Sequence, residues 1–132
     1  MANVLLAEDD DQVRVLAESY LEEQGHDVLS AGTAAGALAL LDKTAQVDVL
    51  FTNVDLKGEI AAGIELAHEA ARRKPNLKVL YTTERSLTDG MKARFVKNSA
   101  FLPKPYTVEQ LLATLSVHFR ISPQQRRQRV SV

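Results

Sequence analysis

The sequence contains no cysteine and no tryptophan. Without cysteine the chain can form no disulfide and no thiolate metal site, which is typical of a reducing compartment. No apolar run approaches the ~20 residues that a bilayer-spanning helix needs. The opening residues, MANVLL, lack the basic start of a secretory signal, and Glu8 interrupts the apolar stretch that follows. We therefore expect a cytoplasmic protein that does not enter a membrane.

Charge of one sign is not in excess either. Sixteen Lys and Arg side chains stand against seventeen Asp and Glu, a net charge of −1, so we do not expect nucleic acid as a partner. Only residues 120–132 depart from this balance, with four arginines and no acid. This segment has no aromatic ring for base stacking, and we expect a basic, flexible tail. The remaining residues, 1–119, fit one domain.

Short apolar runs alternate with segments of helical periodicity along this domain. Apolar residues between Asp11 and Gly25 recur at i, i+3, i+4, i+7 and i+8, which predicts a helix capped by Asp10 or Asp11. The other expected elements are strands at 3–7, 26–31, 47–52, 77–83 and 100–104, and helices at 33–43, 63–74, about 88–98 and 107–119. Five strand–helix units in succession predict an α/β fold. We expect a doubly wound, five-stranded parallel sheet of order 2-1-3-4-5 with helices on both faces.

Polar side chains follow four of the expected strands. In a doubly wound sheet, ligands bind beyond the carboxyl ends of the strands, and the residues at those ends are Glu8, Asp9, Asp10, Asn53, Asp55, Thr82, Thr83 and Lys104. Crowded carboxylates need a compensating cation, and oxygen ligands without His or Cys favour Mg²⁺. Lys104 and the Thr82 hydroxyl suit the oxygens of a phosphoryl group. The constellation predicts phosphoryl-transfer chemistry; no glycine-rich nucleotide-binding motif occurs.

Four segments together carry a family resemblance. These are VLLAEDDDQVR, VDVLFTNVDLKG, KVLYTTE and FLPKPYT. In this order and spacing the chain resembles the receiver domain of bacterial two-component response regulators over residues 2–119. The resemblance implies a role in phosphorelay signalling, a sensor histidine kinase or histidine phosphotransfer protein as donor, and no enzymatic activity of its own. It also implies a downstream partner on the face formed by the fourth helix, fifth strand and fifth helix, and a monomer or weak dimer.

The same resemblance assigns the metal-binding residues. Glu8 and Asp9 correspond to the acidic pair that helps to hold Mg²⁺, and the backbone carbonyl of Asp55 completes the protein ligands together with position 53. That position is the phosphoacceptor, and here it is Asn53. An amide nitrogen has no lone pair available for attack, so Asn53 cannot form an acyl phosphate. We expect Mg²⁺ binding to be weak or absent, with Lys104 approaching Glu8 or Asp9 instead.

Three further residues correspond to the family's switch. Thr82 matches the hydroxyl that turns toward an incoming phosphoryl group, and Lys104 matches the lysine that pairs with it. Phe101 stands at the aromatic position whose ring turns inward or outward on activation. The KP pair implies a cis peptide bond between Lys104 and Pro105. Because Asn53 takes no phosphoryl group, we expect a resting, inactive arrangement with Thr82 away from position 53 and Phe101 turned outward.

Two origins of Asn53 stay open: a deliberate Asp-to-Asn replacement, or a natural receiver without an acceptor. The intact neighbouring residues favour an isolated change. Three function classes also stay open. The chain is a signalling receiver that accepts phosphate when an aspartate stands at position 53, a phosphate-independent adaptor, or, more remotely, an aspartate-nucleophile phosphohydrolase. The three histidines show no metal-ligand spacing, and we expect them on the surface.

Overall fold

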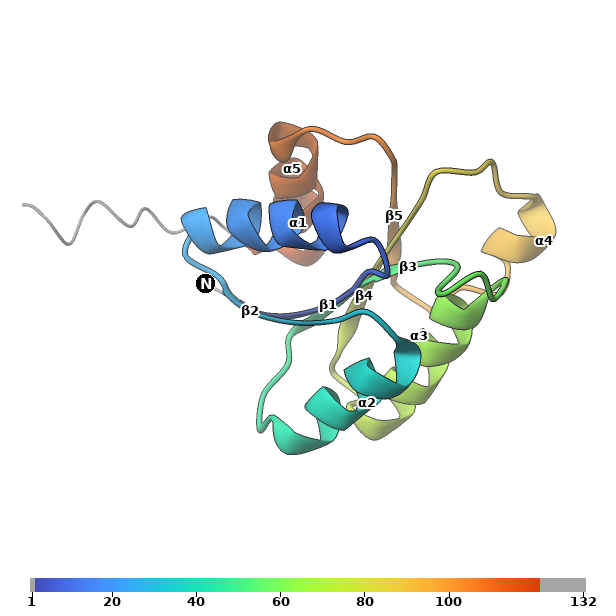
Figure 1. Cartoon of the computed structure of the whole chain (residues 1–132), viewed down its shortest axis with the longest axis horizontal. Helices are drawn as coiled ribbons and strands as arrows, with labels where there is room; N and C mark the ends of the chain where they lie inside the picture. The colour runs from blue at the N-terminus through green and yellow to red at the C-terminus, as the bar shows by residue number, and fades with distance from the viewer. Residues whose placement is uncertain (1, 122–132) are drawn as a thin grey trace, which may run out of the picture.

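Five parallel strands form the central sheet of the computed structural model, which describes residues 2–121 (Figure 1). The strands are β1 (Asn3–Ala7), β2 (Asp27–Ala31), β3 (Val49–Asn53), β4 (Lys78–Thr83) and β5 (Ala100–Pro103). They pair in the order β2-β1-β3-β4-β5, which confirms the predicted topology. After β2 has paired on one side of β1, the chain crosses over and β3 pairs on the other side. The carboxyl ends of β1 and β3 therefore lie side by side, and β4 continues the row.

Helices cover both faces of the sheet. They are α1 (Asp11–Glu23), α2 (Ala34–Lys43), α3 (Ala62–Arg73), α4 (Asp89–Lys92) and α5 (Val108–Phe119). Figure 1 shows α1 and α5 on one side of the sheet and α2 and α3 on the other. Among the described residues, no helix combines the length and apolar character needed to cross a membrane.

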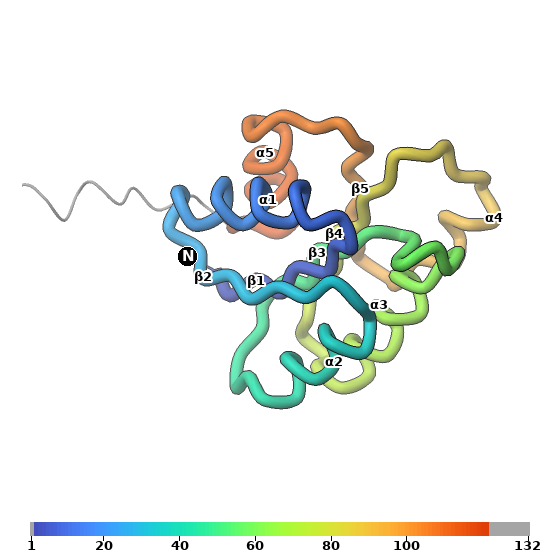
Figure 2. The backbone as a smooth tube through the Cα atoms, in the orientation of Figure 1, coloured from blue at the N-terminus to red at the C-terminus, as the bar shows by residue number. Residues whose placement is uncertain are grey.

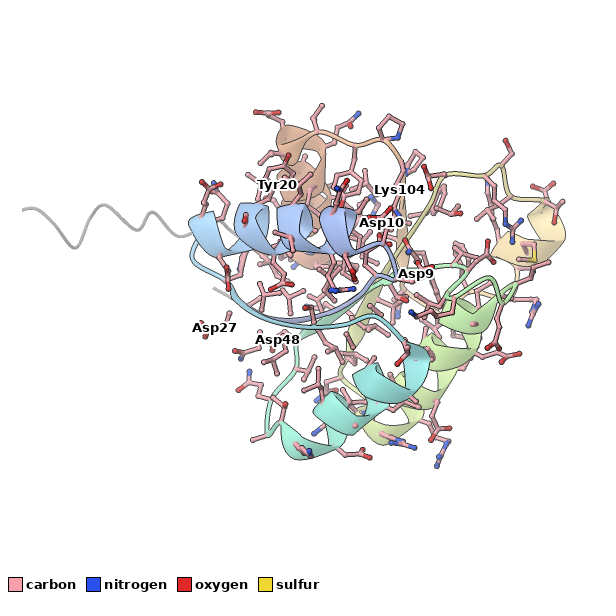
Figure 3. The ribbon with its side chains drawn as sticks, viewed as in Figure 1. Asp9, Asp10, Tyr20, Asp27, Asp48 and Lys104 are labelled. Atoms are coloured by element: carbon pink, nitrogen blue, oxygen red, sulfur yellow. The ribbon has the colours of Figure 1, made fainter. Side chains whose placement is uncertain are left out.

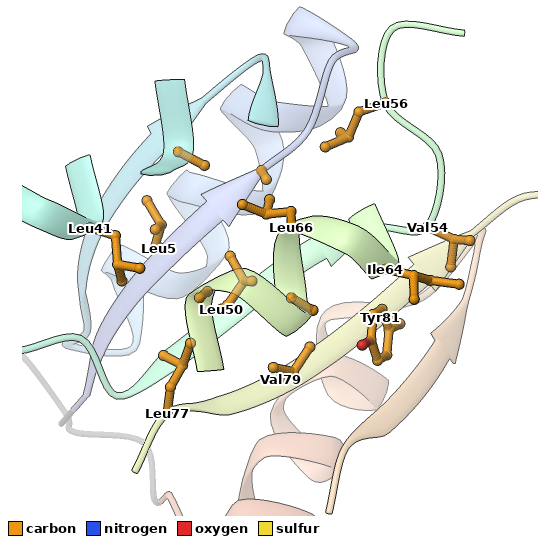
Figure 4. Close-up of a cluster of buried hydrophobic side chains, with 14 of the residues drawn as sticks. Leu5, Leu41, Leu50, Val54, Leu56, Ile64, Leu66, Leu77, Val79 and Tyr81 are labelled. Carbon is orange, nitrogen blue, oxygen red and sulfur yellow. The ribbon is translucent and has the colours of Figure 1, made fainter. Parts of the chain in front are cut away.

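Two apolar clusters, one on each face, hold the layers together. Along β1, Leu5 joins the cluster under α2 and α3, whereas Val4 and Leu6 join the one under α1 and α5. This alternation follows from the two-residue period of a strand, and burial on both faces explains why the strands read as continuous apolar runs. Figure 4 shows the cluster on the α2 and α3 side, where Leu50 and Ile64 are 0–1% exposed.

Side chains define where the helices begin. The Asp10 carboxylate accepts hydrogen bonds from the backbone N–H groups of Gln12 and Val13, so Asp10 rather than Asp11 caps α1. Thr107 caps α5 in a reciprocal pair with Gln110. These caps fix the first turns of both helices next to the carboxyl edge of the sheet.

The helix predicted at about 88–98 is present and begins after the Thr88 cap, but its predicted length is wrong, because α4 ends at Lys92. Beyond that point Phe95 stacks on Tyr81 of β4 with ring centroids 3.9 Å apart, and the backbone N–H of Val96 donates to the Tyr81 hydroxyl. Figure 2 shows the backbone running out to α4 and returning to β5. These tertiary contacts outweigh the helical periodicity of the segment, and the left-handed backbone at Asn98 (φ 61°) precedes β5.

The surface location predicted for the histidines is wrong for His26, which is 3% exposed. Its Nδ1 accepts a hydrogen bond from the backbone N–H of Ala2. Burial lowers the pKa of His26 below its usual value. The ring is therefore a neutral core residue at the amino edge of the sheet. The tail predicted at 120–132 lies, from residue 122 onward, outside the described residues.

Gly63 allows α3 to approach the end of β3. A Cβ atom at this position would lie 1.6 Å from the carbonyl oxygen of Asn53, far inside van der Waals contact. The Gly63 N–H also donates to the Val54 carbonyl at 2.8 Å. The first turn of α3 is thus packed directly against the backbone of Asn53.

Replacing Gly63 with alanine should lower the free energy of unfolding by roughly 3 kcal/mol or more, because a rotamer change cannot relieve a clash with backbone. Gly90→Ala is the matched control. Its Cβ would lie 3.8 Å from Thr88 Oγ1, and alanine in a helix is favoured over glycine by up to ~1 kcal/mol. Urea unfolding followed by circular dichroism measures both. Equal stability of Gly63→Ala and the unaltered chain would contradict the close approach.

Candidate functional site

A polar cleft lies at the carboxyl ends of β1, β3, β4 and β5. Figure 3 shows Asp9, Asp10 and Lys104 at this end of the molecule, with Asp27 and Asp48 at the opposite end. The cleft brings together most of the residues that the sequence placed at strand ends, and adds Val13, Gly58, Glu84 and Arg85. Its lining is Glu8, Asp9, Asp10, Val13, Asn53, Asp55, Gly58, Thr83, Glu84, Arg85 and Lys104.

The Asn53 side-chain amide lies between the two acidic residues that follow β1. Its Nδ2 donates hydrogen bonds to Glu8 Oε2 at 2.6 Å and to Asp9 Oδ1 at 3.0 Å. The opposite assignment of the amide would set Oδ1 against two carboxylates, which like charge disfavours. The Glu8 and Asp9 carboxylates repel each other. The two N–H donors of the Asn53 amide offset part of that repulsion.

Lys104 neutralises the buried member of the acidic pair. Its Nζ lies 2.7 Å from Glu8 Oε1, and the two side chains are 11% and 3% exposed. The backbone N–H of Asp10 also donates to Glu8 Oε2 at 3.0 Å. Breaking a buried ion pair by removing one partner typically costs about 3–5 kcal/mol, because the other charge is left without compensation. Glu8, Lys104 and Asn53 therefore stabilise one another across three strands.

The arrangement does not fit a divalent cation. All four oxygens of the acidic pair already accept hydrogen bonds from the chain, since Asp9 Oδ2 is bound by the backbone N–H of Lys57 at 3.1 Å. Mg²⁺ needs oxygen ligands, whereas Asn53 turns its nitrogen toward the pair. Within residues 2–121, no group of three or more His, Cys, Asp or Glu side chains is placed to hold a metal ion.

Arg85 is a cleft residue that the sequence analysis missed. Its guanidinium forms two hydrogen bonds to the Asp55 carboxylate, Nε to Oδ2 at 2.6 Å and Nη2 to Oδ1 at 3.1 Å. The hydrogen bond from Arg85 holds the pKa of Asp55 below its usual value despite partial burial. Asp55 Oδ1 also accepts from the backbone N–H of Ala61 at 2.7 Å. No spacing rule predicts such a pair between the loops after β3 and β4.

The comparisons with known proteins identify the family. The family model for the response regulator receiver domain matches residues 4–116. The chain belongs to the receiver domain family. It is 29% identical to the sensor kinase CckA of Brucella abortus (strain 2308), over 86% of this chain and 12% of that protein. It is 28% identical to the uncharacterized transcriptional regulatory protein YrkP of Bacillus subtilis (strain 168), over 89% of this chain and 49% of that protein.

Solved receiver structures share the fold of this receiver domain. A response regulator receiver protein from Sinorhizobium medicae WSM419 has a TM-score of 0.80 at 25% identity, covering 90% of this chain and 94% of that one. A CheY-like receiver domain from Methanospirillum hungatei JF-1 has a TM-score of 0.79 at 20% identity, covering 91% and 94%. The chain spans about half or less of the first curated relatives it matches.

Two polar atoms of this receiver domain are buried without a hydrogen-bond partner among the described residues: Asn53 Oδ1 and Thr82 Oγ1. They belong to residues paired in register on β3 and β4. An unsatisfied buried polar group costs about 1–3 kcal/mol. Thr82 is not among the residues that line the cleft, whereas its neighbour Thr83 is.

The remaining residues assigned from the resemblance lie on β5 and just after it. Phe101 is half-buried, and its ring centroid lies 6.2 Å from that of Phe95. The peptide bond between Lys104 and Pro105 is cis. The Phe95 ring therefore contacts the rings of both Tyr81 and Phe101, which the sequence analysis did not anticipate because it placed Phe95 in a longer helix.

Thr82→Val should leave the free energy of unfolding unchanged or raise it by up to about 1 kcal/mol, because valine removes the unpaired hydroxyl and keeps the shape. Thr52→Val is the matched control. Thr52 Oγ1 donates to the Asn53 carbonyl at 2.9 Å, so its loss should cost about 1 kcal/mol. Urea unfolding measures both variants. A larger loss for Thr82→Val than for Thr52→Val would show that the Thr82 hydroxyl has a partner in solution.

Proposed function

We propose that this receiver domain acts in two-component signalling as a docking module in which Asn53 blocks phosphoryl transfer. One observation carries the proposal: the Asn53 amide nitrogen is hydrogen-bonded to both Glu8 and Asp9. In both hydrogen bonds the Asn53 side chain is the donor. An amide oxygen is also a much weaker nucleophile than a carboxylate oxygen. The blocked chemistry follows from the residue itself, whether Asn53 replaced an aspartate or is natural.

A groove beside the cleft supports a docking role. It is lined by apolar side chains of α1 and of the turn after β5, namely Val13, Leu16, Ala17, Tyr20, Pro105 and Tyr106, with Glu84 and Lys104 at the cleft side. Leu16 is 53% exposed. Burial, followed by the charge of Glu8, raises the pKa of Tyr106 to about 12, so its phenol stays neutral.

Receiver domains partner with histidine kinases, and CckA is itself a sensor kinase. We assign the groove to the helices of a sensor histidine kinase or a histidine phosphotransfer protein, because an exposed apolar helix face suits packing by another helix. The face formed by α4, β5 and α5 is the proposed site for the downstream protein. A cytoplasmic location stays a prediction from the sequence.

Labelling with acetyl phosphate distinguishes a receiver that is blocked only by Asn53 from a phosphate-independent adaptor. With Mg²⁺ present, the unaltered chain should gain no mass, and Asn53→Asp should gain one phosphate, because only a carboxylate attacks the phosphoryl group. Asn76→Asp, which makes the same charge change at an exposed site at the other end of the sheet, controls for labelling elsewhere. Intact-mass spectrometry measures all three. Labelling of the unaltered chain would contradict the proposal, and no labelling of either form would favour the phosphate-independent adaptor.

Magnesium should leave the melting temperature of the unaltered chain unchanged, because protein donors occupy the acidic pair. In Asn53→Asp a third carboxylate replaces two of those donors, so a cation that binds the folded state should raise the melting temperature. Asn76→Asp should behave like the unaltered chain. Differential scanning calorimetry with and without millimolar Mg²⁺ measures the shift. A rise in the unaltered chain as large as in Asn53→Asp would contradict this reading of the cleft.

A further inference from the structure

We propose that two copies of this chain associate through the β2 edge of the sheet, with β2 of one copy paired antiparallel to β2 of the other. β2 stands at one end of the strand order, and within residues 2–121 its only strand partner is β1. The residues that line the cleft come from outside β2. The association is therefore independent of the function proposed above and leaves the cleft open.

The two edges of the sheet differ in their protection against pairing with another chain. Exposed edge strands usually carry proline, several charges or a bulge that prevents such pairing. At the other edge, β5 ends in Pro103, which has no N–H to donate to a further strand. β2 contains no proline, its only charged residue is Asp27 at the first position, and its register with β1 runs without a bulge. β2 is therefore the edge that can accept a further strand.

The backbone of β2 offers hydrogen-bonding groups to a further strand at two positions. The Asp27 N–H donates to the Ala2 carbonyl, so Asp27 and every second residue after it bond toward β1. Successive residues of a strand direct their N–H and C=O groups to opposite sides. Val28 and Ser30 therefore direct theirs away from β1, to the open side of the strand.

These two positions are complementary to each other in a two-fold symmetric pair. When two β2 strands lie antiparallel with Leu29 at the centre, Val28 of each copy stands opposite Ser30 of the other. Each such pair exchanges two backbone hydrogen bonds, and the Leu29 side chains of the two copies face each other between them. The same surface patch thus serves both copies, which closes the assembly at a dimer.

Apolar side chains are exposed on both faces of the sheet beside this edge. Leu29 is 41% exposed on the α2 side, in register with Leu5 of the cluster under α2 and α3. Val15 is 59% exposed on α1, one turn before Glu18, whose carboxylate accepts a hydrogen bond from the Ser30 hydroxyl at 2.6 Å. Burial of Leu29 against its copy removes apolar surface from water, which favours association.

The charges at the two ends of the pair are also complementary. Asp27 of one copy lies opposite Ala31 of the other, and both side chains point to the α2 side because they share the parity of Leu29. Shortly after Ala31 the chain enters α2, capped by Thr33, and the first turn of this helix has no acidic residue. The exposed Asp27 carboxylate therefore comes beside the positive end of α2 of the second copy.

Sedimentation equilibrium of the whole chain tests the association. The unaltered chain should dimerise with a Kd below about 1 mM. Leu29→Lys sets two ammonium groups against each other and should weaken the dimer roughly tenfold or more. Val117→Lys, at a site 75% exposed on α5, is the matched control and should dimerise like the unaltered chain. Circular dichroism establishes that each variant is folded.

An unaltered chain that stays monomeric up to about 1 mM would overturn the proposal. Dimerisation of folded Leu29→Lys at the strength of the unaltered chain would also overturn it. Loss of the dimer in Val117→Lys alone would place the association on α5 instead.

Cross-linking tests the register, because the unaltered chain has no cysteine. In Leu29→Cys the two Cα atoms would lie about 4.5 Å apart, within the range of a disulfide. In Asp27→Cys the thiols would be offset by roughly 13 Å along the strands. Oxidation by copper phenanthroline should link Leu29→Cys into dimers on a non-reducing gel, and should not link Asp27→Cys or Val117→Cys. Equal linking of Asp27→Cys and Leu29→Cys would overturn the proposed pairing.

Discussion

The buried carboxylate of Glu8 is the constraint on which the cleft depends. A charge that is 3% exposed is stable only with close donors, and here Lys104, the Asn53 amide and the Asp10 backbone supply them. These donors come from β3, from the residue after β5 and from the loop after β1, so the charge holds together segments up to 96 residues apart. The polar network therefore stabilises the same sheet edge that positions the site.

An amide at position 53 acts differently at its two ends. Its nitrogen supplies the donors that Glu8 and Asp9 need, and the cleft is satisfied on that side without a metal. Within residues 2–121 no group hydrogen-bonds its oxygen, and the same is true of the Thr82 hydroxyl on the paired strand. An aspartate would reverse the first effect, because three carboxylates repel one another without a cation. The atom at this one position thus decides whether the chain itself offers donors to Glu8 and Asp9 or adds a third negative charge beside them.

The segment between β4 and β5 is held by aromatic packing rather than by a long helix. The Phe95 ring packs against the rings of Tyr81 and Phe101, and the backbone N–H of Val96 donates to the Tyr81 hydroxyl. These contacts limit α4 to four residues. The Phe95 ring thus contacts one ring from β4 and one from β5.

The sequence by itself determined the strand order and the position of the cleft, because two-sided burial makes the strands apolar and the carboxyl ends of parallel strands meet at one edge. It also placed Glu8, Asp9, Asn53 and Lys104 there. Only the tertiary structure decided what those side chains contact. The Arg85–Asp55 pair, the short α4 and the burial of His26 arise from packing between distant segments. The direction of the Asn53 amide was equally open in the sequence, because its two ends are distinguished only by the carboxylates that the fold sets around it.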